Sequence, residues 1–347
     1  MREQYYDSLN LLKFVLAVII IFHHWQQNTG TVFESFNFHR GMIYFGYAVE
    51  FFFIISGFLM GIQHDKTVQS DFGNFFRKRA ERVYPMAALS TVVTTIVMGV
   101  YHYVTGKWFF DIVPGIWRIF NSLTLTFSGG VVGNVGLGIN NPFWYLCVLL
   151  ICYVEYWICS QMFSKYVIKE IFGYIGLCAV GIGAHYYKID FPFLNNPASR
   201  GMAAFFLGVV LFYIYRDVSK KMLGIVSGVV LGFLIMAAMV DFKLFYDDQW
   251  GIFTFIMFPS ILFLALLAEE RISFRKVRIL GAVSFEMYLW HIPALVLLQT
   301  ANAVTKVSYS RSAMILFAAV VTGWASLVYQ MLEKPLSQWL EARRKRK

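Results

Sequence analysis

The chain has 347 residues, of which 58% are hydrophobic, 18% are aromatic and only 14% are charged. This composition excludes an ordinary soluble domain and predicts a polytopic membrane protein. The net charge of +10 does not indicate a nucleic-acid partner, because the basic residues fall in alternate loops, as the orientation of helices in a bilayer requires.

Continuous apolar runs of about 20 residues, without the alternation typical of barrel strands, predict an all-α transmembrane helical bundle. We expect ten spans, at residues 8–26, 43–62, 84–104, 142–162, 170–187, 199–215, 222–240, 251–268, 279–300 and 312–332. A cytoplasmic amino terminus puts most lysines and arginines inside, and the even number of spans then puts both termini there. We expect one domain over residues 1–347, with a short basic cytoplasmic tail at about 333–347.

The first span, LNLLKFVLAVIIIFHHW, carries Lys13 near its start and His23 and His24 near its end. An ionisable residue inside a membrane predicts a functional site, because a charge away from water costs several kcal/mol. His24 is eleven positions after Lys13, which at about 100° and about 1.5 Å per residue places them on one helix face, roughly 16 Å apart. Imidazole can take a proton from a hydroxyl, so His24 is a candidate general base. The alternative is that it bonds a neighbouring carbonyl.

Glu50 lies inside the second span, within GYAVEFFFIISGFLM. An unpaired carboxylate would be costly there, so it must be paired, protonated or facing water. It could orient or stabilise His24 or Lys13, or it could form a structural hydrogen bond between helices. Ser56 and Gly57 predict close helix packing rather than a nucleophilic serine.

The stretch FFRKRAERVYP packs Arg77, Lys78, Arg79 and Arg82 before the third span. Arg79 and Arg82 are spaced i, i+3, so on a helix they share a face and could fork around phosphate oxygens. The alternative is that the cluster only orients the chain in the membrane. Pro85 suits the first turn of the following helix.

The longest outer connection covers about residues 105–141. Its aromatic part, WFFDIVPGIWRIF, predicts an interfacial or re-entrant helix, and its glycine-rich part, SGGVVGNVGLGIN, predicts a flexible loop. A plain connecting loop with an aromatic surface anchor is an equal alternative.

Three later stretches carry weaker signals. Trp144 and Tyr145 begin the fourth span, where aromatic residues are mostly interfacial. SFEMYLWHIP gives the ninth span Tyr288 and His291, and Pro293 should kink that helix. Glu333, Lys334 and Pro335 end the last span. The four cysteines show no metal-ligand spacing, so we expect reduced packing residues and no metal site.

Taken in order, these stretches resemble one family, the membrane acyltransferase family 3, whose bacterial multi-span members O-acylate sugars of surface polysaccharides. Members show an Arg or Lys, ten residues and a His in the first span, an acidic residue before FF and SGF in the second, RxxR with a following proline, YLWH, and a late glutamate, basic residue and proline. The matching residues are Lys13 and His24; Glu50, Phe52, Phe53, Ser56, Gly57 and Phe58; Arg79, Arg82 and Pro85; Tyr288, Leu289, Trp290 and His291; and Glu333, Lys334 and Pro335.

The resemblance implies an acyl-CoA donor, most often acetyl-CoA, a carbohydrate hydroxyl as acceptor, and the bacterial cytoplasmic membrane as location. We therefore expect an O-acetyltransferase that modifies an exopolysaccharide, a capsule or a lipid-linked precursor, with no permanently bound cofactor. The expected catalytic residues are His24, Lys13 and Glu50; the expected acyl-CoA-binding residues are Arg79, Arg82, Arg77 and Lys78; and the expected supporting residues are His23, Ser56, Trp144, Tyr145, Tyr288 and His291. A passage should join Lys13 to His24, and the sequence leaves open whether a homo-oligomer forms.

The chain also departs from the family pattern. Many members carry a glutamate five residues after the fourth-span tryptophan, whereas Leu149 stands there after Trp144. This puts a catalytic glutamate in that span in doubt. The hydrolase-like periplasmic domain of some members is not present, so we expect transfer to finish within the membrane domain.

Two other classes of function remain open. In a transporter or flippase, the intramembrane Lys, His and Glu would form a proton relay and no CoA would be needed. A sensor or scaffold would explain the loops but would give Lys13, Glu50 and His24 no purpose.

Overall fold

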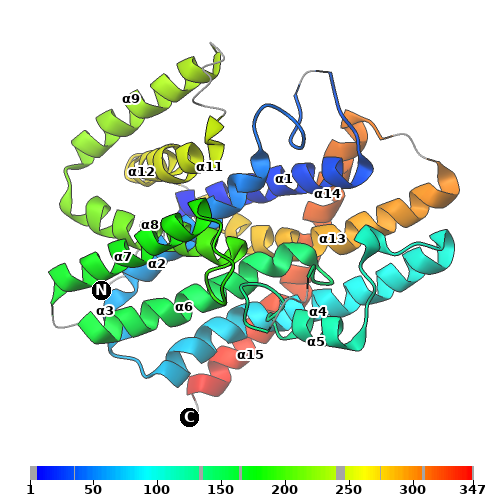
Figure 1. Ribbon diagram of the computed structural model, residues 1–347, viewed down its shortest axis with the longest axis horizontal. Coiled ribbons are helices and arrows are strands. Elements are labelled where there is room, and N and C mark those ends of the chain that lie inside the picture. The colour runs from blue at the N-terminus through cyan, green and yellow to red at the C-terminus, as the bar shows by residue number, and fades with distance from the viewer. Residues whose placement is uncertain are drawn as a thin grey trace.

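The computed structural model describes residues 6–34, 36–132, 136–163, 166–239, 247–273, 275–306 and 309–345. Within these ranges the secondary structure is entirely helical (Figure 1). Ten of its helical segments are long and apolar enough to cross a membrane. The predicted all-α bundle with ten spans is thus confirmed, since a backbone in lipid must satisfy its own hydrogen bonds.

The spans follow one another with short helices between them. They are α1 (Asp7–Thr29), α2 (Ala48–Ile62), α4 (Phe72–Thr105), α6 (Trp144–Phe163), α7 (Val167–Tyr186), α8 (Asn196–Asp217), α9 (Lys220–Met239), α11 (Gln249–Ile252) continued by a π-helical turn (Phe253–Met257) into α12 (Phe258–Glu269), α13 (Leu280–Thr305), and α14 (Arg311–Val328) continued by a π-helical turn (Tyr329–Glu333) into α15 (Lys334–Lys345). The short helices are α3 (His64–Val68) and α5 (Ile116–Leu123), and 3-10 turns (Phe45–Tyr47, Asn141–Phe143) precede α2 and α6.

α1 is a central helix of the bundle. It packs against α2, α12, α13 and α14, and Figure 1 shows it running between α12 and α13. Asp7 in its first turn pairs with Arg278, at 2.8 Å between Oδ1 and Nε. Gly30 ends it with φ 67°, a left-handed conformation that glycine adopts without strain. The central position explains why Lys13 and His24 face protein.

The predicted start of the third span is wrong. α4 begins at Phe72, because Asp71 caps it by accepting a hydrogen bond from the Asn74 backbone N–H at 3.0 Å. The arginine cluster therefore lies on the helix itself, and Pro85 lies inside the helix rather than in its first turn. The last span is also longer than expected, because α14 continues through α15 instead of ending near residue 332.

Two glycines let α2 and α8 approach closely. A Cβ at Gly57 would overlap the carbonyl oxygen of Phe205, and a Cβ at Gly208 would overlap that of Ile54. Small residues at helix contacts are the usual means of close packing in membranes, where lipid gives no hydrophobic drive for association. The predicted packing role of Gly57 agrees with this geometry.

Replacing Gly208 by Ala should therefore destabilise the protein. We expect a loss of about 1–3 kcal/mol, the usual cost of overpacking a close contact, seen as a lower midpoint of thermal unfolding in detergent. The matched control is Gly228→Ala in α9, where an added Cβ meets no atom within 4 Å. Alanine favours a helix by up to about 1 kcal/mol over glycine, so the control should melt at or above the wild-type temperature. Equal melting of G208A and wild type would contradict the proposed contact.

The connection predicted to lie outside contains the short helix α5. Its apolar residues Ile116, Trp117 and Phe120 are exposed, whereas Asn121 and Ser122 are buried. Apolar side chains on the surface suit contact with lipid, as an interfacial helix requires. Of the glycine-rich stretch, residues 133–135 lie outside the described residues.

Candidate active site

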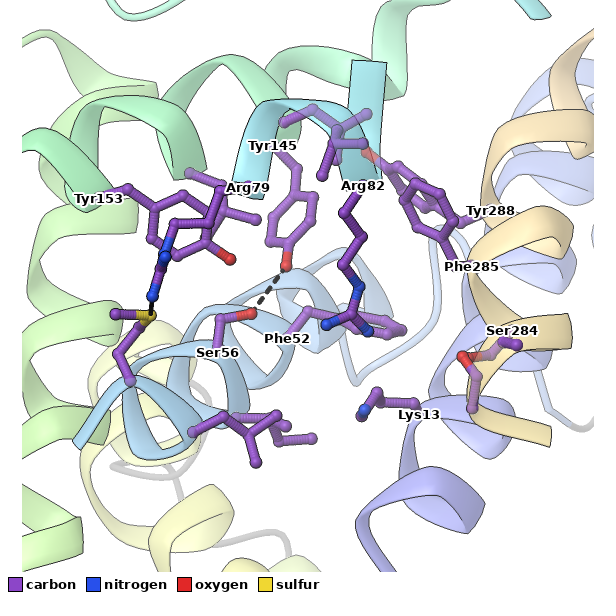
Figure 2. Close-up of a pocket in the computed structure, with 18 of the residues that line it drawn as sticks. Lys13, Phe52, Ser56, Arg79, Arg82, Tyr145, Tyr153, Ser284, Phe285 and Tyr288 are labelled. Carbon is purple, nitrogen blue, oxygen red and sulfur yellow. Dashed lines mark hydrogen bonds between the residues drawn. The ribbon is translucent and has the colours of Figure 1, made fainter. Parts of the chain in front are cut away.

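A cavity of about 360 Å³ lies among α1, α2, α4, α6 and α13, at the predicted cytoplasmic half of the bundle (Figure 2). Its wall is strongly cationic: Lys13, Lys78, Arg79 and Arg82 line it, and Glu333 is the one acidic residue among the described lining residues. Figure 2 shows the side chains of Lys13 and Arg82 pointing into the same space. Its other lining residues include Asn10, Phe52, Ser56, Tyr145, Tyr153, Ser284, Phe285 and Tyr288. The excess of positive charge in this lining suits an anionic ligand.

A second cavity of about 310 Å³ adjoins the first between α4 and α15. Lys78, Arg82 and Glu333 line both cavities. Arg344 of α15 lines the second cavity and pairs with Glu81 at 3.4 Å. The C-terminal helix, expected from the sequence only as a basic tail, thus forms one wall of this space.

Neither Arg79 nor Arg82 forms an ion pair with a carboxylate in the described part of the chain, although Arg82 interacts electrostatically with Glu333. The Arg79 guanidinium lies 3.7 Å from the centroid of the Phe75 ring, and its Nη1 donates to the Phe75 carbonyl at 3.0 Å. Its Nε is buried and has no hydrogen-bond partner. Arg82 is exposed and forms no hydrogen bond or ion pair within the described ranges. Their free donors suit phosphate oxygens, which accept from arginine in a fork.

The other two cations of the predicted cluster differ in position. Lys78 lines both cavities. Arg77 is exposed, does not line either cavity, and instead lies 3.7 Å from Glu81 and donates to Asn74 at 3.2 Å. The structure therefore groups Lys78, Arg79 and Arg82 and leaves Arg77 outside.

Polar groups from three helices complete the wall. Lys13 Nζ donates to Asn10 Oδ1 at 3.1 Å, and the Ser56 hydroxyl lies 3.2 Å from the Tyr145 hydroxyl. Each of these four side chains faces the cavity. Lys13 keeps further donors for a ligand, because an ammonium carries three N–H groups.

His24 forms a separate constellation with His291. His24 Nδ1 lies 2.9 Å from His291 Nε2, and the two rings are stacked with centroids 5.0 Å apart. His291 is fully buried, and its Nδ1 lies 2.8 Å from the carbonyl oxygen of Tyr288. A carbonyl can only accept, so His291 Nδ1 carries the proton and, in the neutral ring, Nε2 accepts from His24 Nδ1–H. This chain of bonds leaves His24 Nε2 with a free lone pair.

Tyr288 links the histidine pair to the cavity. Its ring lines the cavity, its carbonyl receives the His291 bond, and its hydroxyl donates to the Pro142 carbonyl. His24 and His291 do not line this cavity. The expected passage from Lys13 to His24 is therefore seen only as far as Tyr288.

His23 points to different partners. It is buried, and its Nδ1 lies 2.8 Å from the carbonyl oxygen of Phe38 in the loop after α1. Its ring contacts the rings of His39 and Tyr44, with centroids 4.9 and 5.2 Å away. The two adjacent histidines thus have different partners: His23 contacts the loop after α1, and His24 contacts His291 of α13.

Glu50 is held by Arg200 and Trp250 rather than by a first-span residue. Its Oε1 accepts from Arg200 Nε at 2.6 Å and from Trp250 Nε1 at 3.0 Å, and Arg200 Nη2 lies 2.5 Å away. Glu50 is fully buried. Among the described residues, Glu50 makes no contact with Lys13 or His24. The geometry therefore favours the structural hydrogen bond between helices over an orienting role for Glu50.

Arg200 is the residue that sequence reasoning missed. It lies in the first two turns of α8 and between aromatic rings, with its guanidinium carbon 5.2 Å from the Trp144 ring centroid. Trp144 accordingly belongs with Arg200 and does not line the cavity. A signal was present, because an arginine entering an apolar span is a natural partner for an intramembrane glutamate.

Comparison with known proteins agrees with this architecture. The family model described as "Acyltransferase domain" matches residues 6–331. The chain belongs to the acyltransferase 3 family. The resemblance drawn from its motifs is thereby confirmed, and this acyltransferase 3 protein is a membrane acyltransferase by family.

The curated relatives are distant and longer. The O-acetyltransferase OatA of Staphylococcus aureus strain NCTC 8325 / PS 47 is 23% identical over 320 residues, which cover 83% of this chain and 52% of that relative. OatA of Staphylococcus aureus strain COL gives the same values. This acyltransferase 3 chain thus spans about half the length of the curated relatives it matches. No solved structure matches it.

Proposed function

We propose that this protein O-acetylates a hydroxyl of a cell-surface or exported polysaccharide, or of its lipid-linked precursor, with acetyl-CoA as donor, in the bacterial cytoplasmic membrane. The observation that carries the proposal is the cationic cavity together with the neighbouring histidine pair. Tyr288 lies between them, and His24 Nε2 of the pair has a free lone pair. Family membership favours acyl transfer over transport. The name of the relative, O-acetyltransferase, supports acetyl as the group transferred to oxygen.

The donor would enter from the predicted cytoplasmic end. The CoA phosphates would bind Arg79 and Arg82, and the nucleotide would extend into the second cavity beside Lys78. The pantetheine arm would run past Ser56 and Tyr145, with Lys13 near the thioester end. A volume of about 360 Å³ lies within the usual range of ligand pockets, about 300–1,000 Å³.

The chemistry would use His24 as general base. Its Nε2 removes the proton from the acceptor hydroxyl, and the oxygen attacks the thioester carbonyl. The carbon–sulfur bond then breaks, the thiolate leaves as CoA, and the imidazolium returns the proton to it. The thioester must pass Tyr288 to reach His24, so this route includes a movement of that side chain. An acyl-histidine intermediate would use the same nitrogen as nucleophile.

The test is transfer of label. Membranes containing the protein are incubated with acetyl-labelled CoA, and surface polysaccharides are analysed for label that mild base releases. Base-labile label in the polysaccharide, dependent on the protein, is the expected result. Polysaccharide that acquires no label, or a proton-coupled movement of substrate without CoA, would overturn the proposal.

Replacing Arg82 by Ala should weaken donor binding specifically. Arg82 lines both cavities and forms no hydrogen bond or ion pair within the described ranges, so its loss removes a charged hydrogen bond to the donor worth about 1.5–3 kcal/mol. The KM for acetyl-CoA should rise about 10- to 100-fold, with little change in melting temperature. Arg77→Ala is the matched control, since Arg77 lies outside the cavities, and its KM should stay at the wild-type value. Equal effects of both changes would assign the cluster to membrane orientation instead.

A further inference from the structure

The predicted outer end of the bundle carries an aromatic surface that the proposed catalytic step does not use. Tyr44 and Tyr47 precede α2, Trp144 begins α6, and Arg200 lies near the start of α8. The ring centroids of Tyr44 and Tyr47 are 4.9 Å apart, and the Arg200 guanidinium carbon lies 5.5 Å from the Tyr47 ring and 5.2 Å from the Trp144 ring. Tyr44 is 40% exposed, and Tyr47 and Trp144 are half-buried. We call Tyr44, Tyr47, Trp144 and Arg200 the aromatic platform.

The platform begins beside the histidines. The Tyr44 ring lies edge-on to His23, with centroids 5.2 Å apart, and His23 lies 5.4 Å from His24 by the same measure. Tyr44 is also fixed by its backbone N–H, which donates to Gln249 at 2.8 Å. A molecule lying on the platform would therefore extend toward the proposed base.

The charge at the centre of the platform is neutralised. Glu50 accepts both bonds from Arg200 through Oε1, which leaves its fully buried Oε2 without a partner. Arg200 Nη1 likewise forms no hydrogen bond in the described part of the chain, and the Arg200 side chain is 18% exposed. Arg200 Nη1 thus remains a free donor on a partly exposed side chain beside aromatic rings, whereas buried Glu50 Oε2 is not exposed to a ligand. Sugar hydroxyls both donate and accept, and the C–H face of a sugar ring packs on aromatic rings.

We propose that the aromatic platform binds a sugar ring of the acceptor glycan. The ring would stack on Trp144 and Tyr47, a hydroxyl would accept from Arg200, and the next part of the glycan would reach His24. Because Glu50 neutralises Arg200, the platform selects sugar hydroxyls rather than a sugar carboxylate. This inference rests on the proposed function, and it assigns Trp144 and Tyr47 to substrate binding rather than to a membrane-surface belt.

The experiment separates acceptor binding from donor binding. Transfer is measured with wild type, Trp144→Ala and Trp144→Phe, using as acceptor surface polysaccharide freed of its acetyl groups by mild base. We expect W144A to raise the half-saturating acceptor concentration at least tenfold and to leave the KM for acetyl-CoA within twofold of wild type. W144F, which keeps a ring, should stay within threefold. Tyr103→Ala is the control, because Tyr103 is 91% exposed on α4 and outside the platform.

Binding of the same polysaccharide to purified protein in detergent is measured in parallel. One outcome separates the two proposals: wild type binds polysaccharide, W144A binds it at least tenfold more weakly, and neither protein transfers acetyl. That result would support the aromatic platform as a glycan-binding site and contradict the proposed acetyltransferase function. Equal acceptor affinity of W144A and wild type would overturn the platform, with or without transfer. An effect of W144A on membrane insertion or on lipid binding alone would also overturn it, since the rings would then anchor the protein in the membrane.

Discussion

Replacing His24 by Gln is expected to lower the rate of acetyl transfer by about a hundredfold to ten-thousandfold, the usual contribution of a general base. Glutamine can still donate to His291 Nε2 and nearly fills the space of the imidazole, so the contact with His291, at 2.9 Å in the wild type, should survive. What it lacks is a nitrogen that can take the acceptor proton. The measurement is the rate of label transfer from acetyl-CoA to polysaccharide in membranes with equal amounts of protein.

The adjacent histidine provides the matched control. His23 bonds the Phe38 carbonyl and has no contact with His291 in the described residues, so His23→Gln should change the rate by less than about tenfold. Near-normal transfer by H24Q together with loss of transfer by H23Q would move the base to His23. If both variants lose transfer but keep the wild-type melting temperature, both histidines are needed for the reaction.

Replacing Arg200 by Ala should cause the largest loss of stability among single changes at the sites described above. It would strand the Glu50 carboxylate, which is fully buried and bonded to Arg200 at 2.5 and 2.6 Å. Breaking a buried pair by removing one partner costs about 3–5 kcal/mol, because an uncompensated charge remains. We expect R200A to unfold at a much lower temperature in detergent, or to fail to accumulate in membranes.

A double variant tests whether the Glu50–Arg200 pair is needed only for stability or also for binding the acceptor. Glu50→Gln with Arg200→Met removes both charges, and the glutamine oxygen can still accept from Trp250 Nε1, 3.0 Å from Glu50 in the wild type. Replacing both partners is often close to neutral for stability, so the double variant should regain most of the melting temperature. A melting temperature of R200A equal to that of wild type would contradict the pairing. A double variant that folds and keeps its acceptor affinity would limit the pair to a structural role.

Much of the architecture follows from the sequence because lipid leaves few alternatives. Apolar runs long enough to span the membrane must be helical, which gave the number and order of the spans. The spacing of Arg79 and Arg82 correctly placed both on one face, and both line the cavity with Lys13. The start of α4 was predicted too late because Pro85 suits the first turn of a helix, whereas in the structure Asp71 caps the helix thirteen residues before Tyr84 and Pro85 lies inside it.

The partners of the intramembrane residues were decided only by the tertiary structure. His24 meets a histidine 267 residues away, and Glu50 meets an arginine 150 residues away. Helix rotation sets such pairs, and in lipid the apolar pattern says little about rotation, because the core and the bilayer are equally apolar. The sequence by itself therefore determined which residues are costly to bury and on which helix each one lies. Close packing, as at Gly57 and Gly208 between α2 and α8, decided which of them meet, because only the packed bundle fixes how each helix is turned.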